Sequence, residues 1–320
     1  MTARVPRGIT SLRASPYLLL TLTALFWAGN WVIARGLQGS MPPIAMAFWR
    51  WFAALVLLLP FVLRSLLAER AVIRRSWKIL VVLGVLGVGA FNICTYTGLR
   101  YTTASTGVLL NSVTPVLILA VAAVFLREKV HGWQAGGVAL SLAGVLVIMA
   151  RGQWDRLVGL TLNPGDLWVL AAVTAWAAYT ICLRWRPRGL SSAAFTGVLI
   201  LIGVVAIAPL FAWEYAQGAR TAWNATTYAA VAYFAVFPSV LAYFFWNAAV
   251  ARVGGNRAGV FLHFVPLFGT LLSVVFLREQ LLWYHYAGAA LIFGGIYAAS
   301  RAVHRAPRGA RAVTALQRRE

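Results

Sequence analysis

The chain has 320 residues, of which 61% are hydrophobic and only 11% are charged, and its formal net charge is +21 at pH 7. Soluble domains carry about a quarter charged residues, so this composition excludes an ordinary soluble globular protein. A strongly basic chain can bind nucleic acid through a surface patch. Here the basic residues lie between long apolar stretches, so we expect membrane lipids as partners and no nucleic acid.

Apolar stretches follow one another along almost the whole chain, and each is long enough to cross a hydrocarbon core of ~30 Å as a helix. The first stretch follows three arginines, as the core of a signal peptide does, but it is too long and lacks a small-residue cleavage site. We therefore expect an all-α integral membrane protein with ten transmembrane helices, the first of them retained. The expected spans are 17–36, 43–63, 77–98, 103–126, 132–150, 165–184, 191–213, 225–250, 256–277 and 283–300.

Lysine and arginine are divided unequally between alternate connections of these spans. If the N-terminus is cytoplasmic, the tails and the connections on that side hold 21 of these residues, and the opposite connections hold five. Cytoplasmic loops of membrane proteins carry such an excess. We therefore expect a multi-pass protein of the bacterial inner membrane with both termini in the cytoplasm.

The second half of the sequence repeats the first. The letters VFLRE occur at 124–128 and again at 275–279, an offset of 151 that also aligns Pro115 with Pro266. An offset of 149 places WAGNWVIAR, which begins at Trp27, over WAAYTICLR, which begins at Trp176. Each copy holds five expected crossings, an odd number, so the second copy enters the membrane from the opposite side. Inverted repeats of this kind are typical of transporters that alternate between two openings.

The expected organisation is thus a cytoplasmic segment over 1–16, a first repeat over 17–150, a second repeat over 165–300 and a basic cytoplasmic tail over 301–320. Small residues should let the fifth and tenth helices approach closely, because glycines recur at the repeat offset on both. The Arg–Glu pairs of the two VFLRE copies should cap helix ends through weak surface contacts. The glycines are Gly137, Gly144, Gly288 and Gly295.

Several stretches resemble one family of membrane proteins. They are LFWAGNWVIARGL in the first expected helix, PPIAMAFWRWFAAL at the second, and STGVLLNSVTPVLILAVAAVFLREKVHGWQAGGVALSLAGVLVI through the fourth and fifth. These stretches are similar to the EamA group of the drug/metabolite transporter superfamily, and the resemblance covers roughly residues 15–300. The many Trp and Tyr residues in the helices resemble the YddG-type exporters of aromatic amino acids and methionine. The resemblance implies a secondary transporter that exports such small metabolites by alternating access and is not an enzyme.

Polar and aromatic residues three or four positions apart share a helix face and can line a common site. Trp27 and Asn30 form such a pair on the first expected helix, and the repeat places Trp176 and Tyr179 at their counterparts on the sixth. These four residues are candidate substrate-binding residues.

The third and eighth expected helices carry the same two residue types in exchanged order, Asn92 with Tyr96 and Tyr243 with Asn247. An unpaired amide in hydrocarbon costs several kcal/mol, so the asparagines should face other helices or a wet cavity. One interpretation is a central cavity in which amides bind the amino and carboxyl groups of an amino acid-like substrate while the rings pack on its side chain. The alternative is hydrogen bonding between helices alone.

Pro115 and Pro266 each remove a backbone donor, so the fourth and ninth helices should kink there and are candidate hinges, with a static kink as the alternative. Asn111 and His263 lie beside these positions and can bond the freed carbonyls or contact substrate. A histidine inside a span can titrate during transport. A neutral histidine bonded across helices is the interpretation we favour.

Arg50 lies about seven residues into the second expected helix, where a charge must snorkel or find a partner. It could attract a substrate carboxylate near the outer mouth, but the aligned position, Leu199, has no arginine. We favour a structural role for this residue.

The sequence contains no P-loop, and we expect no cofactor and no metal site. Cys94 and Cys182 lie within expected spans and are interpreted as small core residues. Other metabolites, such as other amino acids, nucleosides or drugs, are alternative substrates, and a monomer is a possible state. The rival class is a membrane enzyme acting on lipid-linked substrates, for which His131 near Glu128 is the nearest catalytic pair.

Overall fold

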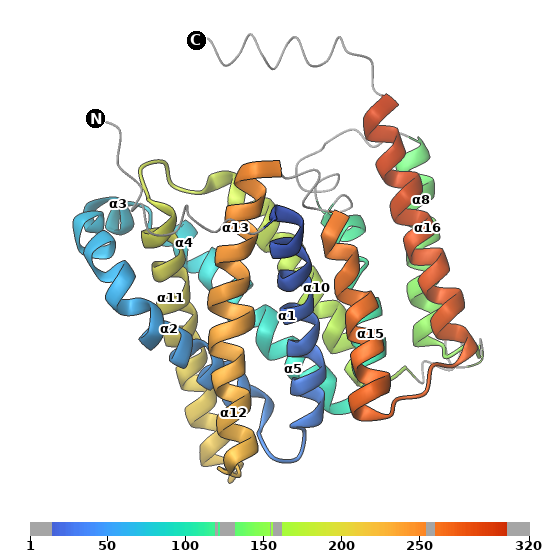
Figure 1. Cartoon of the computed structure of the whole chain (residues 1–320), viewed down its shortest axis with the longest axis horizontal. Coiled ribbons are helices and arrows are strands. Elements are labelled where there is room, and N and C mark those ends of the chain that lie inside the picture. Colours follow the sequence, from blue (N-terminus) through green and yellow to red (C-terminus); the bar gives the residue numbers. More distant parts are fainter. Residues whose placement is uncertain are drawn as a thin grey trace. The chain divides into compact units, whose positions relative to one another are not determined.

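The computed structural model describes residues 15–118, 121, 132–153, 155, 162–253 and 260–305. All regular structure in these residues is helical (Figure 1). The chain divides into two compact units. The first consists of Met1–Asn111 with Asn163–Leu281, and the second consists of Ser112–Leu162 with Leu282–Glu320.

The first unit contains most of the helices, and the second contains two long ones, α8 (Gly132–Met149) and α16 (Trp283–Arg305). The helices of the first unit are α1 (Pro16–Gly36), α2 (Pro43–Ala68), α3 (Arg70–Arg75), α4 (Trp77–Gly84), η1 (Val85–Ala90), α5 (Phe91–Tyr101), α6 (Ala104–Asn111), α10 (Pro164–Cys182), η2 (Leu183–Trp185), α11 (Ser192–Ala216), α12 (Ala225–Phe234), η3 (Ala235–Leu241), α13 (Ala242–Val253), η4 (Val260–His263) and α15 (Phe264–Leu277).

Among the described residues, six helical stretches are long and apolar enough to cross a membrane, and the protein is therefore an all-helical, multi-pass membrane protein. Three shorter apolar helices fall within the expected fourth, fifth and ninth spans. The full count of ten crossings remains a prediction. The six stretches are Pro16–Gly36, Pro43–Ala68, Trp77–Tyr101, Pro164–Trp185, Ser192–Ala216 and Ala225–Trp246.

Several helices begin where the local sequence favours a start. Pro16, Pro43 and Pro164 each stand in the first turn of a helix, where a missing backbone N–H leaves no carbonyl unpaired. The side chain of Asn163 accepts a hydrogen bond from the backbone N–H of Gly165 at 2.8 Å and caps α10.

Helices α2 and α11 cap each other. Glu214, in the last turn of α11, accepts hydrogen bonds from the backbone N–H groups of Ile44 and Ala45 at 3.2 and 2.8 Å, at the start of α2. Glu69, at the end of α2, accepts one at 2.8 Å from the backbone N–H of Ser191, just before α11. The end of each helix therefore lies at the start of the other, so these second helices of the two sequence copies run antiparallel.

The second unit is a close helix pair. A Cβ atom added to Gly144 would lie 2.6 Å from the carbonyl oxygen of Gly288, and one added to Gly295 would lie 2.5 Å from that of Gly137. Only glycine permits backbones to approach so closely. The expected close approach of the fifth and tenth helices at their glycines is confirmed. Figure 1 shows these helices, α8 and α16, side by side.

Two π-helical stretches occupy repeat-related places. Shifting η1 by 151 residues places it on 236–241, within η3. Each stretch continues directly from an α-helix and into the next one, so it widens one apolar helix by an extra residue per turn. Such insertions occur frequently at functional sites. The hydrophobic pattern of the sequence does not indicate them.

The α-helical segments that contain the two candidate hinge prolines begin just ahead of these residues. Helix α6 ends at Asn111, a turn follows, and a new helical segment covers 114–118. Likewise α15 begins at Phe264, directly after the 3-10 helix η4. Pro115 and Pro266 thus lie in first turns, where the missing N–H group is not needed. Their hinge role stays a prediction.

The carboxylate of the second VFLRE copy is not a weak surface contact, contrary to the expectation. Glu279 accepts hydrogen bonds from the backbone N–H groups of Ala104 and Ser105 at 2.8 and 2.9 Å, and from the Ser105 hydroxyl at 2.6 Å. It thereby caps the start of α6. The first copy, at 124–128, lies outside the described residues.

Candidate functional site

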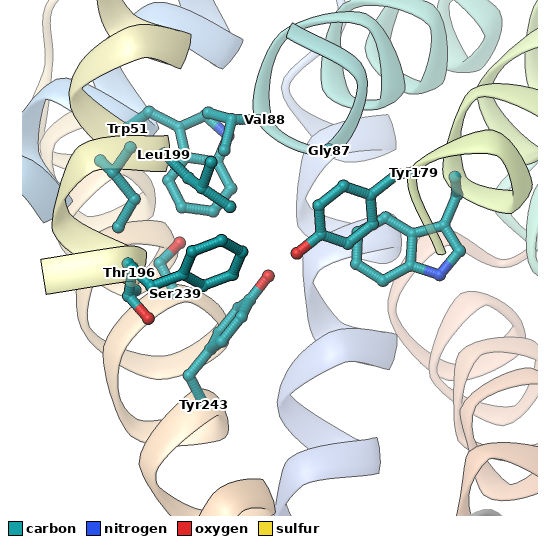
Figure 2. Close-up of a pocket in the computed structure, with 11 residues that line it drawn as sticks. Trp51, Gly87, Val88, Tyr179, Thr196, Leu199, Ser239 and Tyr243 are labelled. Atoms are coloured by element: carbon teal, nitrogen blue, oxygen red, sulfur yellow. The ribbon is translucent and has the colours of Figure 1, made fainter. Parts of the chain in front are cut away.

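A cavity with about 410 Å³ of empty space lies within the first unit (Figure 2). Helices from both halves of the sequence contribute to its wall, namely α2, η1, α10, α11, η3 and α13. Only a small part of the space is wide enough for a water molecule, so a ligand the size of an amino acid requires the side chains to move apart. Its aromatic lining residues are Trp51, Trp176, Tyr179, Phe195 and Tyr243.

Two tyrosine hydroxyls face this cavity. Figure 2 shows the hydroxyl groups of Tyr179, on α10, and Tyr243, on α13, pointing toward each other. Neither hydroxyl forms a hydrogen bond with another described residue. The ring of Tyr179 packs against Trp176, with 5.0 Å between centroids. Five of the eleven residues that line the cavity are thus aromatic, and the two tyrosine hydroxyls are among the polar groups that a ligand can contact.

Beside the cavity, the guanidinium group of Arg50 on α2 donates hydrogen bonds to side chains of three other elements. Its Nη1 atom donates to Asn30 Oδ1 and Asn92 Oδ1, each at 3.0 Å, and to Tyr96 Oη at 2.8 Å. Its Nε atom donates to Ser239 Oγ at 3.0 Å. The Tyr96 hydroxyl in turn donates to Asn30 Oδ1 at 2.8 Å. All five side chains are buried.

Ser239 and Trp51 connect this Arg50 cluster to the cavity. Both residues line the cavity, and Figure 2 shows them on its wall. Ser239 accepts from Arg50, whose guanidinium carbon lies 4.8 Å from the centroid of the Trp51 ring. The indole N–H of Trp51 is buried and has no hydrogen-bond partner among the described residues.

The structure brings together six of the ten candidate substrate-binding residues in two neighbouring groups. Three of them hold Arg50, and three line the cavity. The first three are Asn30, Asn92 and Tyr96, and the second three are Trp176, Tyr179 and Tyr243.

The remaining candidates lie elsewhere. Trp27 does not line the cavity: its Nε1 atom donates to the carbonyl oxygen of Pro238 at 3.1 Å, and its ring contacts Tyr243, with 6.3 Å between centroids. Asn111 ends α6 and His263 ends η4, and neither lines the cavity. The side chain of Asn247 lies outside the described residues.

Sequence reasoning missed the position of Arg50 at the centre of a polar cluster. One pattern could have indicated it, because all seven acidic residues lie near span ends or outside the spans, and Arg50 is thus an internal charge without an internal carboxylate. The contributions of Trp51, Gly87 and Ser239 to the cavity had no pattern of this kind.

A second cavity of the first unit, with about 930 Å³ of empty space, lies at helix ends. Its wall includes Gln38, Arg100, Glu214 and Arg220, from the segment that precedes α2, the end of α5, the end of α11 and the segment that follows α11. It shares no lining residue with the first cavity. It is more open and more charged, as expected of space near the ends of membrane helices.

Comparison with known proteins shows relatives along nearly the whole chain. The uncharacterized transporter YyaM of Bacillus subtilis is 24% identical over 284 residues, which cover 89% of this chain and 93% of that protein. A probable terminal-alkyne amino-acid exporter of Streptantibioticus cattleyicolor is 29% identical over 231 residues, 71% of this chain and 74% of that protein.

A solved crystal structure matches 92% of this chain and 99% of its own, with a TM-score of 0.57 and 22% identity, and so shows a shared fold. The EamA-like transporter family matches the sequence twice, at residues 14–150 and 163–301. These two matches cover both copies of the repeat. The chain is a member of the EamA-like transporter family.

Proposed function

We propose that this protein is a secondary transporter that exports small metabolites, foremost aromatic or neutral amino acids, across the bacterial inner membrane by alternating access. Transport proceeds through the aromatic cavity of the first unit. The observation that carries the proposal is this cavity, which is built by helices of both family matches and is lined by Trp176, Tyr179 and Tyr243 next to the buried polar cluster around Arg50.

The composition of the cavity wall supports an amino acid-like substrate. Aromatic faces pack well on apolar and aromatic side chains, whereas the hydroxyl, indole and guanidinium groups nearby suit the polar end of the same molecule. The name of the S. cattleyicolor relative, a probable exporter of an unusual amino acid, agrees with this substrate class.

The proposed topology has ten crossings, with both termini in the cytoplasm and the second copy inverted relative to the first. The excess of basic residues in the tails and alternate connections supports this orientation. The antiparallel pairing of α2 with α11 supports the inversion, because these are the second helices of the two copies. Inverted copies can exchange two conformations that open to opposite sides.

Flux measurements in proteoliposomes test the proposal. The purified full-length chain is reconstituted and the uptake of radiolabelled phenylalanine, tryptophan, methionine, threonine and a nucleoside is followed, with and without a pH gradient. We expect saturable flux of the aromatic or neutral amino acids above that of protein-free vesicles. Acceleration by an opposed pH gradient would indicate proton coupling, and absence of flux for every compound would refute the proposal.

A further inference from the structure

We infer that Arg50 binds the carboxylate of the transported compound, so that the protein selects apolar and aromatic compounds bearing a carboxylate over amines and nucleosides. The inference rests on the proposed export function and specifies its substrate class. Arg50 is 5% exposed, and its charge is held by uncharged groups alone.

The first argument is the number of hydrogen-bond donors. A guanidinium group has five N–H donors. In this structure the Nε–H group donates to Ser239. The Nη1 group donates to three acceptors, which are Asn30, Asn92 and Tyr96. No described residue accepts from Nη2.

A neighbouring donor is also unused. Trp51 lies directly after Arg50 in α2, is 3% exposed and lines the cavity, and its indole N–H has no partner among the described residues. A buried donor without a partner is costly, and the Trp51 N–H is such a donor beside the cavity. The two N–H groups of Nη2 and the N–H group of Trp51 therefore have no acceptor among the described residues and can bind a group rich in acceptor atoms.

The second argument is charge. A buried cation is normally paired with an anion, because removing a guanidinium from water is expensive. Within the described part of the chain, no carboxylate pairs with Arg50. A carboxylate supplies a compensating negative charge and oxygen atoms that accept hydrogen bonds from the open Nη2 N–H groups. An amine or a neutral nucleoside supplies no negative charge.

The third argument is the asymmetry of the two sequence copies. At the repeat offsets, the counterparts of Asn30, Arg50 and Asn92 are aromatic or apolar residues. Those counterparts line the aromatic cavity, whereas the first-copy residues form the polar cluster. A bound molecule is thus met by polar groups on one side and by rings on the other. The counterparts, in the same order, are Tyr179, Leu199 and Tyr243.

This arrangement fixes the orientation of the ligand. Its carboxylate faces Arg50 and the Trp51 indole N–H, and its side chain lies among Trp176, Tyr179 and Tyr243. The Asn30, Asn92 and Tyr96 side chains act as positioning residues, because their bonds to Nη1 hold the guanidinium plane.

A comparison of ligands on the unaltered protein tests the inference without relying on a variant that folds. Competition against the best transported amino acid of the flux panel is measured in proteoliposomes with three probes: phenylalanine, phenylalaninamide and 3-phenylpropionate. The amide lacks the carboxylate charge and the propionate lacks the amine. We expect the inhibition constant of phenylalaninamide to be at least roughly tenfold higher than that of phenylalanine, because a charge-assisted hydrogen-bond pair contributes a free energy in this range. 3-Phenylpropionate should compete well.

Variants add a second measurement. Arg50→Lys keeps the charge but removes the Nη2 donors. We expect weaker competition by phenylalanine with little change for phenylalaninamide, so the difference between them shrinks. Arg35→Lys is the matched control, because Arg35 is a second arginine of the first unit and its acceptors among the described residues are the backbone carbonyls of Leu99 and Arg100. It should preserve the full difference between acid and amide.

The outcomes separate the two claims. If amino acids are carried and the amide competes as well as the acid, the carrier stands and the carboxylate site is refuted. The same conclusion follows if only the nucleoside is carried. If no compound is carried at all, the export function itself fails, and a preference for carboxylates has no transported compound to act on.

Discussion

The hydroxyl oxygen of Ser141 donates a hydrogen bond to the backbone carbonyl oxygen of Ile292 at 3.1 Å, and the two residues are 151 positions apart. That separation is the repeat offset, so equivalent positions of the two copies contact each other. Contacts between equivalent positions arise at an approximate two-fold axis. The second unit is therefore built around a local symmetry axis between α8 and α16.

The glycines around this contact show the direction of the two helices. Gly144 packs on Gly288, and Gly137 packs on Gly295. Parallel copies would pair each glycine with its own counterpart, Gly137 with Gly288 and Gly144 with Gly295. The observed pairing is crossed, so the fifth helix of one copy runs antiparallel to that of the other.

The first prediction concerns this packing. Gly144→Ala should destabilise the protein by roughly 1–3 kcal/mol, because overpacking a close contact has this cost. The added Cβ would lie 2.6 Å from the Gly288 oxygen and 2.9 Å from the Ile292 nitrogen. Gly136, on the same helix, has nothing within 4 Å of its added Cβ, so Gly136→Ala should be neutral or stabilising. Thermal unfolding in detergent compares the two, and equal midpoints would disprove the close approach.

The second prediction concerns the width of the cavity. A Cβ on Gly87, in η1, would lie 2.7 Å from the Tyr179 ring, so Gly87→Ala must displace this ring of the cavity wall. We expect a several-fold fall in amino-acid flux with little change in thermal stability. Gly89, in the same π-helix, has nothing within 4 Å, and Gly89→Ala should retain normal flux. Equal flux in both variants would place the transport path away from Tyr179.

The third prediction compares two tryptophans of α10. Trp176 lines the cavity, whereas Trp168 does not line it and is 42% exposed. Trp176→Ala should raise the KM for aromatic substrates roughly tenfold, because burying an apolar side chain against a ring contributes on the order of 1–2 kcal/mol. Trp168→Ala should leave the KM unchanged. Similar KM values for both variants would argue that Trp176 packs on protein alone.

The helices themselves could be predicted from the sequence, because hydrocarbon permits little else than apolar helical segments. Helix α10 illustrates this, since the expected span 165–184 differs little from Pro164–Cys182. The glycine contacts of α8 and α16 also followed from the repeat. The π-helices did not, because one extra residue in a uniformly apolar run leaves no mark on its periodicity.

The site could be predicted only in part. The repeat and the helical spacing indicated Asn30, Asn92 and Tyr96 one by one. Their meeting at Arg50 depends on side chains 20, 42 and 46 residues away and on Ser239, 189 residues away, and no local pattern contains such distances. Spacing also does not give side-chain direction. The Trp27 indole accordingly bonds to η3 and does not enter the cavity wall.

The most direct test of the account is the membrane side of two repeat-related connections, the one between α1 and α2 and the one between η2 and α11. Single cysteines are introduced as Ser40→Cys in the first connection and as Ser192→Cys at the first residue of α11, directly after the second connection, in a background in which Cys94 and Cys182 are replaced by alanine. A membrane-impermeant maleimide is then applied to right-side-out and inverted vesicles. The account predicts that Ser40→Cys reacts only from the outer side and Ser192→Cys only from the cytoplasmic side. Reaction of both cysteines from the same side would contradict the antiparallel copies on which the transport mechanism depends.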